Sequence, residues 1–108
     1  MSQPNNISIV PGQDGVKSAT PSLTLPTEKT LLQATKLALK TKKPICFYFY
    51  IDSLKGKITI VSDGEDRVIF KNEDEHTSPI INTYKSDNCY IVVTENTIYI
   101  ISSGTQVR

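Results

Sequence analysis

The spacing of the apolar residues changes at Pro44. Before Pro44, apolar positions follow the 3.6-residue period of a helix, and after it they recur at every second residue, as in a strand. Pro44 also disfavours helical geometry at Lys43. The sequence therefore predicts one helix over residues 27–42, followed by a small β domain over residues 43–103.

Six short runs of alternating or β-branched residues predict six strands in the β domain. Short polar connections separate most of the runs, and Asp63-Gly64 is a strong hairpin signal, so consecutive strands are expected to pair antiparallel. Because closure removes exposed edges, we expect this meander to curl into a small SH3-like barrel, giving a mainly β (α+β) fold. The predicted strands are residues 45–51, 57–61, 67–71, 80–84, 89–94 and 97–102.

The predicted helix has two distinct sides. Thr27 is a suitable N-cap and Glu28 is favourable in the first turn. The apolar side should cover the strand at residues 45–51, which is apolar on both faces and needs cover on both. The apolar side carries Leu31, Leu32, Ala34, Thr35, Ala38 and Leu39, and the opposite side carries Lys29, Gln33, Lys36 and Lys40.

Residues 1–26 resemble an arm more than a packed element. Four prolines in this stretch oppose helix propagation and remove strand donors. Two interpretations are open: a disordered tail, or an extended arm that becomes ordered on a protein partner. In the second case the partner-binding residues are Ile7, Ile9, Leu23 and Leu25. Residues 104–108 are predicted to be a short tail.

Size and charge limit the function classes. The 108 residues allow one domain with a thin core, which favours stabilisation within an assembly. A net charge of +1 gives no general attraction to nucleic acid or acidic lipid. No apolar leader and no run of about 18 apolar residues is present, so we expect a soluble intracellular protein without a membrane partner.

The sequence offers little catalytic chemistry. His76 is the only histidine and lies in an acidic run, residues 73–76, that is expected to be a solvated loop and not a metal site. Cys46 and Cys89 lie in apolar runs and are expected to be reduced, buried thiols. The glycines form no phosphate-binding loop. We therefore expect a non-enzymatic protein with no catalytic residues, metal or cofactor.

One alternative site combines aromatic and basic residues. Tyr48 and Tyr50 alternate on the first predicted strand, where exposed rings would stack on the bases of a single-stranded nucleic acid. The lysines of the helix, Lys29, Lys36 and Lys40, would contact its phosphates. The competing interpretations are that the tyrosines pack under the helix and that the lysines form a solvated face.

The stretch from Lys43 to Ser103 resembles small β-rich proteins of nucleocytoplasmic large DNA viruses. This resemblance implies a viral context, with the host cytoplasm and the virion as locations, and brings no catalytic residues. Our leading expectation is a structural or protein-interaction module, a minor virion component, that binds a protein partner or a second copy of itself. The resemblance is carried by residues 44–46, 52–54, 73–80 and 90–100.

Overall fold

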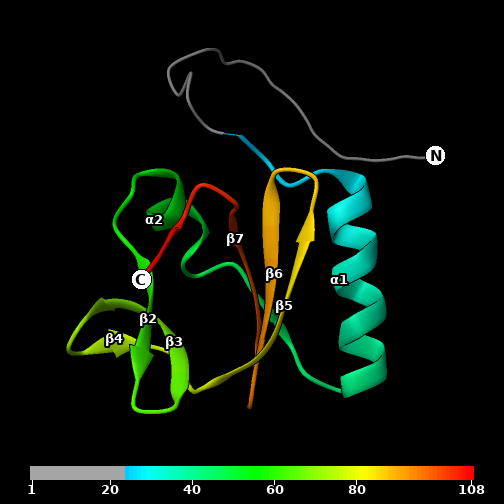
Figure 1. Ribbon diagram of the computed structural model, residues 1–108. Coiled ribbons are helices and arrows are strands. Elements are labelled where there is room, and N and C mark those ends of the chain that lie inside the picture. The colour runs from blue at the N-terminus through cyan, green and yellow to red at the C-terminus, as the bar shows by residue number, and fades with distance from the viewer. Residues whose placement is uncertain (1–23) are drawn as a thin grey trace.

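The computed structural model describes residues 24–108, which form two helices and eight strands (Figure 1). The helices are α1 (Glu28–Thr41) and α2 (Tyr50–Leu54). The strands are β1 (Ile45–Cys46), β2 (Thr59–Asp63), β3 (Asp66–Asn72), β4 (Glu75–His76), β5 (Ile80–Ser86), β6 (Cys89–Thr94), β7 (Ile98–Ser102) and β8 (Gln106–Val107).

Helix α1 begins and ends where the sequence predicts. The Thr27 side chain accepts a hydrogen bond from the backbone N–H of Thr30, which satisfies one free donor of the first turn. Lys42 adopts a left-handed conformation with φ of 61° and donates its N–H to the carbonyl of Ala38. The predicted helix is therefore confirmed.

The eight strands form two open, mixed sheets of four strands each. The first sheet has the order β1-β7-β6-β5 and the second has the order β4-β3-β2-β8. Three predicted antiparallel pairs are present: β2 with β3, β5 with β6, and β6 with β7. Two pairs are parallel, β1 with β7 and β2 with β8. The predicted closed barrel is wrong, because β1 does not pair with β2 and joins the far side of β7 instead.

The strand predicted at residues 45–51 is also wrong beyond its first two residues. After Cys46 the chain turns, with the N–H of Tyr50 donating to the carbonyl of Phe47, and continues as α2. The turn places Phe49 in one apolar cluster and Tyr50 in the other. Burial of two neighbouring aromatic rings in different clusters outweighs the β propensity of this run.

Two further strands lie outside the predicted ones. β4 is formed by Glu75 and His76 in the segment predicted to be a polar loop, and it pairs with β3. β8 lies in the predicted tail and pairs in parallel with β2, and Arg108 N–H donates to the carbonyl of Ile60 at 2.8 Å. A strand of two residues is too short to show the alternation of apolar and polar residues by which strands are predicted.

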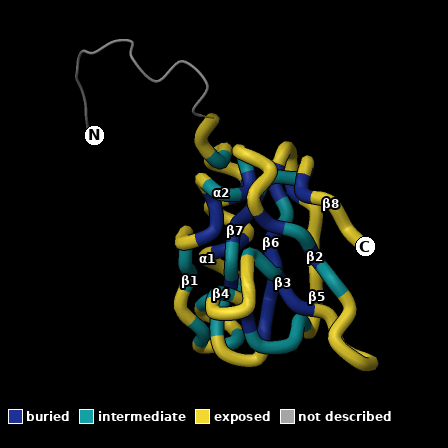
Figure 2. The backbone as a smooth tube through the Cα atoms, turned by 90° about the vertical axis from the view of Figure 1, so that its left-hand side faces the viewer, coloured by how far each residue is buried: buried dark blue, intermediate teal, exposed yellow. Residues whose placement is uncertain are grey.

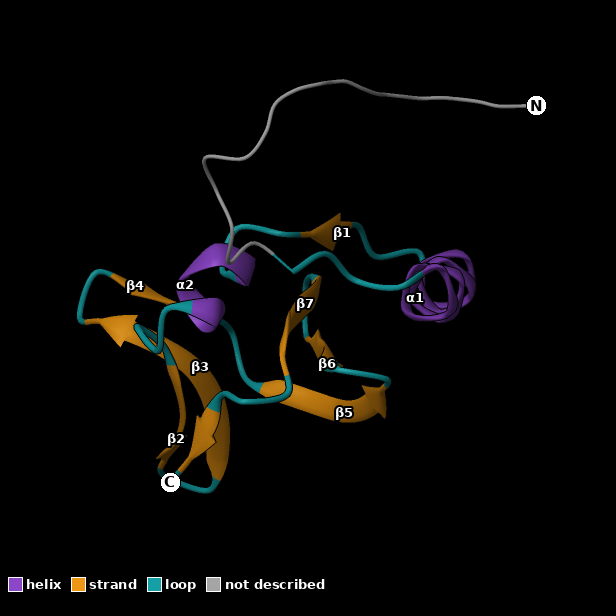
Figure 3. Cartoon of the chain, turned by 90° about the horizontal axis from the view of Figure 1, so that it is seen from above, coloured by secondary structure: helices purple, strands orange, loops and turns teal. Residues whose placement is uncertain are grey.

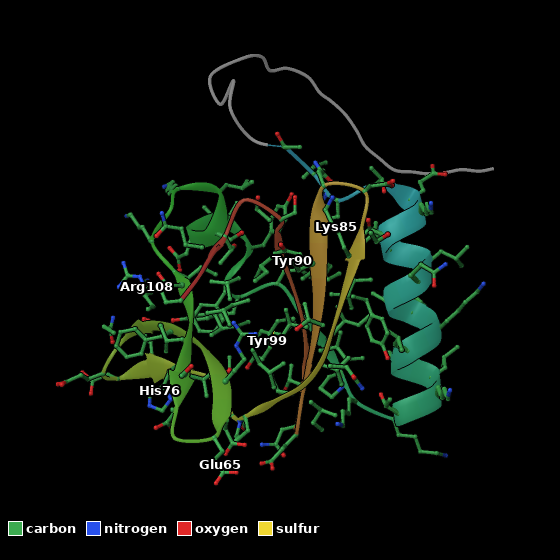
Figure 4. The ribbon with its side chains drawn as sticks, viewed as in Figure 1. Glu65, His76, Lys85, Tyr90, Tyr99 and Arg108 are labelled. Carbon is green, nitrogen blue, oxygen red and sulfur yellow. The ribbon has the colours of Figure 1, made fainter. Side chains whose placement is uncertain are left out.

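The two sheets and α1 form three layers with β6 and β7 at the centre. Figures 1 and 3 show α1 on the side of the first sheet that faces away from the second sheet. Figure 2 shows the backbone of β6 and β7 largely buried. The side chains of the central strands that face α1 are Cys89, Ile91, Val93, Ile98 and Ile100. Those that face the second sheet are Val92 and Ile101. Tyr90 and Tyr99 are partly buried beside them (Figure 4).

Because β7 is central and β5 lies at an edge, replacing an isoleucine by alanine should destabilise the protein more on β7 than on β5. Ile101 is fully buried, whereas Ile81 on β5 is 53% exposed. Ile101→Ala is expected to lower the free energy of unfolding by about 2–5 kcal/mol through lost burial and the cavity that remains. Ile81→Ala should cost less than about 1 kcal/mol. Urea unfolding followed by circular dichroism measures both, and equal losses would contradict this arrangement of the core.

Candidate interaction surface

The most prominent exposed apolar surface lies on α1. We define the leucine face as Leu31, Leu32 and Leu39, whose side chains are 38%, 55% and 75% exposed. Leu32, Thr35 and Leu39 are spaced by three and four residues, so they follow one line along the helix. Figure 3 shows no other element of residues 24–108 on the outer side of α1. The leucine face is therefore open in this part of the chain.

The leucines point outward because α1 packs through smaller side chains. Thr30 and Ala34 are fully buried against the first sheet, and Leu37 and Ala38 are partly buried beside them. The Thr30 hydroxyl donates to the carbonyl of Ser86 at 3.0 Å, which satisfies this buried polar group. The predicted apolar side is thus correct for Ala34 and Ala38 and wrong for the leucines, because small residues allow the helix to approach the sheet closely.

Exposed lysines border the leucine face on one side. Lys29, Lys36 and Lys40 lie on the flank of α1 between the leucines and the side turned toward β5. On that side a groove of about 310 Å³ separates α1 from β5. The groove is lined by Lys29, Gln33, Leu37, Tyr84, Lys85, Ser86, Asp87 and Ile91. The surface thus combines an apolar stripe with a basic border.

The tyrosines predicted to stack on nucleic-acid bases do not share a strand face. Tyr50 is buried in α2, and its hydroxyl donates to the carbonyl of Thr24. Tyr48 is exposed in the turn before α2, and its hydroxyl donates to the Glu75 carboxylate at 3.0 Å. Figures 1 and 3 show α2 separated from α1 and its lysines by strands of the first sheet. The two tyrosines and the lysines are therefore not brought together.

Tyr48 instead belongs to a charged network that joins α2 to β3 and β4. The Lys71 ammonium lies 3.2 Å from the Asp52 carboxylate and 3.6 Å from that of Glu75. The hydrogen bond to Glu75, followed by the charge of that carboxylate, raises the pKa of Tyr48. The hydrogen bond with Asp52 raises the pKa of Lys71. The charged side chains are half-buried, with exposures of 29% for Lys71, 19% for Asp52 and 28% for Glu75, and their contacts connect the turn before α2 to β3 and β4.

His76 borders a second hollow, on the outer face of the second sheet. Its imidazole is stacked on the Phe70 ring, with an angle of 19° between the planes and centroids 6.5 Å apart. The hollow has a volume of about 420 Å³ and is lined by Val61, Ser62, Asp63, Val68, Phe70, Glu73 and His76. Within residues 24–108, no group of three or more His, Cys, Asp or Glu side chains is arranged to hold a metal ion.

The two cysteines are free thiols with different exposure. Cys46 on β1 is half-buried, and Cys89 on β6 is fully buried. Burial raises the pKa of the Cys89 thiol, because the thiolate would lose its hydration. Full burial is thus confirmed for Cys89 and wrong for Cys46.

The residues expected to bind a partner through the arm are mostly beyond the described structure. Ile7, Ile9 and Leu23 lie outside residues 24–108. Leu25 is 68% exposed in the segment that leads into α1. Sequence patterning did not identify the leucine face as a site, since an amphipathic helix normally buries its leucines.

Comparison with known proteins identifies no relative of this chain. No protein-family model, curated protein or solved structure matches it. Among residues 24–108, neither helix is long and apolar enough to cross a membrane.

Because the two thiols differ in exposure, they should react with an alkylating reagent at different rates. In the folded protein, Cys46 should react with an alkylating reagent first, and Cys89 should react only when the core opens. Mass spectrometry of Cys46→Ser, with and without denaturant, measures the protection of Cys89. Rapid modification of Cys89 in the folded state would contradict its burial.

The Tyr48–Glu75 contact predicts a site-specific titration. Only the protonated phenol donates to Glu75, so the contact stabilises the fold below the ordinary tyrosine pKa of 10.0 and is lost as pH rises through the raised folded-state pKa. Glu75→Gln should lower the pKa of Tyr48 toward its ordinary value. Ring-labelled tyrosine NMR, assigned with Tyr48→Phe, measures this change, and Glu73→Gln is a charge-matched control that should leave it unaltered.

Proposed function

We propose that this protein is a protein-interaction module that binds an acidic, amphipathic helix of a protein partner through the leucine face of α1. The observation that carries the proposal is the outward orientation of Leu31, Leu32 and Leu39, although α1 is packed against a sheet. A set of leucines exposed along one helix is costly in water and is typical of a surface that is covered in a complex.

The geometry of the surface favours a helical partner. Leu32, Thr35 and Leu39 repeat at the three- and four-residue spacing used by helices that pack side by side. The 14 residues of α1 span about 21 Å at 1.5 Å per residue, enough for about two heptads of such contact. An added helix would continue the layered arrangement by covering the outer side of α1.

The lysine border specifies the charge of the partner. Lys29, Lys36 and Lys40 would lie beside the edge of a helix seated on the leucines, where Glu or Asp would be attracted and Lys or Arg repelled. Such rim charges contribute more to orientation and association rate than to affinity. The expected partner helix therefore has an apolar stripe flanked by acidic residues.

A structural role in an assembly is part of this proposal. A small module that exposes a set of leucines along one helix is suited to joining other proteins. The resemblance to viral proteins further suggests a partner within the virion. Tyr48 and Tyr50 do not share a face on which bases could stack, so single-stranded nucleic acid is the less favoured ligand.

A pair of synthetic peptides tests the proposal directly. The probe is a 21-residue amphipathic helix with a leucine stripe flanked by glutamate, and its matched counterpart has lysine at every glutamate position. The wild-type protein should bind the acidic peptide more tightly than the basic one, with affinity falling as salt rises. Isothermal titration calorimetry measures both affinities, and equal binding or no binding of the two peptides would overturn the proposal.

Variants on the protein side locate the binding surface. The double variant Leu32→Gln, Leu39→Gln should weaken binding of the acidic peptide by about tenfold or more, because each buried leucine contributes roughly 1.5 kcal/mol or more. Val107→Gln removes an exposed apolar side chain from β8 and serves as the control. Unchanged affinity in the leucine variant, or equal loss in the control, would contradict binding at the leucine face.

A further inference from the structure

The outer strands of the two sheets differ greatly in length. In residues 24–108 the sheets end in four strands, namely β1 and β5 in the first sheet and β4 and β8 in the second. β1, β4 and β8 each have two residues, whereas β5 has seven. Very short edge strands are a common protection against pairing with another chain. β5 is thus the one edge in this part of the chain that is long enough to template a further strand.

Among residues 24–108, no strand pairs with the outer edge of β5, and this edge is weakly protected. The five residues 81–85 are all exposed, and they include the large side chains of Ile81 and Tyr84. No proline lies within β5, and Lys85 is its only charged residue. A register shift near Ile81 disturbs only the start of the strand. The usual protective features, which are inward charges, prolines and bulges, are therefore missing from the segment 82–85.

The β5–β6 turn determines which backbone groups face outward. Asp87 and Asn88 form a two-residue turn, with φ of 53° at Asp87, closed by the pair Ser86–Cys89. In an antiparallel pair, alternate residues direct their N–H and C=O groups to the partner strand. Asn82, Tyr84 and Ser86 therefore direct their backbone groups toward β6, whereas Thr83 and Lys85 direct theirs away from β6.

We infer that β5 pairs antiparallel with β5 of a second copy of this chain, about a two-fold axis at Thr83. A two-fold axis makes the interface self-complementary, so the same residues are used by both copies. Thr83 then faces Thr83 of the second copy, and Tyr84 faces Asn82. Lys85 faces Ile81, so no like charges are directly opposed, and the threonine pair is a favourable cross-strand contact.

The residue pattern of β5 is compatible with pairing to a second copy of the same strand. In this register no two like charges are opposed, and the outward backbone groups of Thr83 meet those of Thr83 in the second copy. Pairing would join the two first sheets into one continuous sheet of eight strands, four from each copy. Because the axis is perpendicular to the sheet, both α1 helices would lie on the same side and present two leucine faces to one partner surface.

Charge substitution at the axis tests the inference. Thr83→Lys places two introduced lysines opposite each other, and Thr83→Glu does the same with two carboxylates. Each variant alone should raise the dimer dissociation constant by about fivefold or more, whereas an equimolar mixture of the two should restore or exceed wild-type dimerisation. Sedimentation velocity over a concentration series measures all four samples, and circular dichroism confirms that each variant is folded.

A control on β8 distinguishes pairing through β5 from a general effect of added charge. Gln106→Lys adds the same charge on exposed β8 and should leave dimerisation unchanged. Loss of dimer in this control equal to that in Thr83→Lys would overturn the inference, as would a wild-type protein that stays monomeric at the highest soluble concentration. Failure of the mixture to form the mixed dimer would also overturn it. None of these results depends on binding of the acidic peptide.

Discussion

The antiparallel pair of β6 and β7 forms the centre of the core, and the other elements pack around it. Both strands are apolar on both faces, so neither face tolerates water, and each has to be covered by another element. One face carries Ile91, Ile98 and Ile100 and is covered by α1, whereas Val92 and Ile101 on the other are covered by the second sheet and Phe49. The three-layer arrangement follows from this requirement.

The same requirement explains the unusual exposure on α1. Thr30 and Ala34 are small, so the helix approaches the central strands closely and covers them with backbone and short side chains. Leu37 packs at the border of this contact, and in this orientation Leu31, Leu32 and Leu39 lie on the outer side of the helix. Close packing inside and an apolar surface outside are thus two results of one helix orientation, and they connect the core to the proposed function.

The sequence predicted the elements whose pattern is long and regular. Helix α1 and the strands β2, β3, β5, β6 and β7 were predicted close to their observed positions, together with three of their pairings. It failed at Phe49 and Tyr50, where alternating aromatic residues form a turn and a short helix, because local propensity does not reveal that the two rings enter different clusters. The leucine face was not predicted, because an amphipathic pattern shows that a helix has two different sides but does not show which side packs against the sheet.

The order of a helix followed by a β-rich unit follows from the sequence, because the hydrophobic period and the proline at position 44 act locally. The tertiary structure alone decided that the strands form two open sheets, because β1 and β8 join through parallel pairings between distant segments. It also decided that α1 packs through Ala34 and exposes Leu39, and that β5 is left as the long edge. These choices depend on how layers fit together, and no local pattern of residues encodes them.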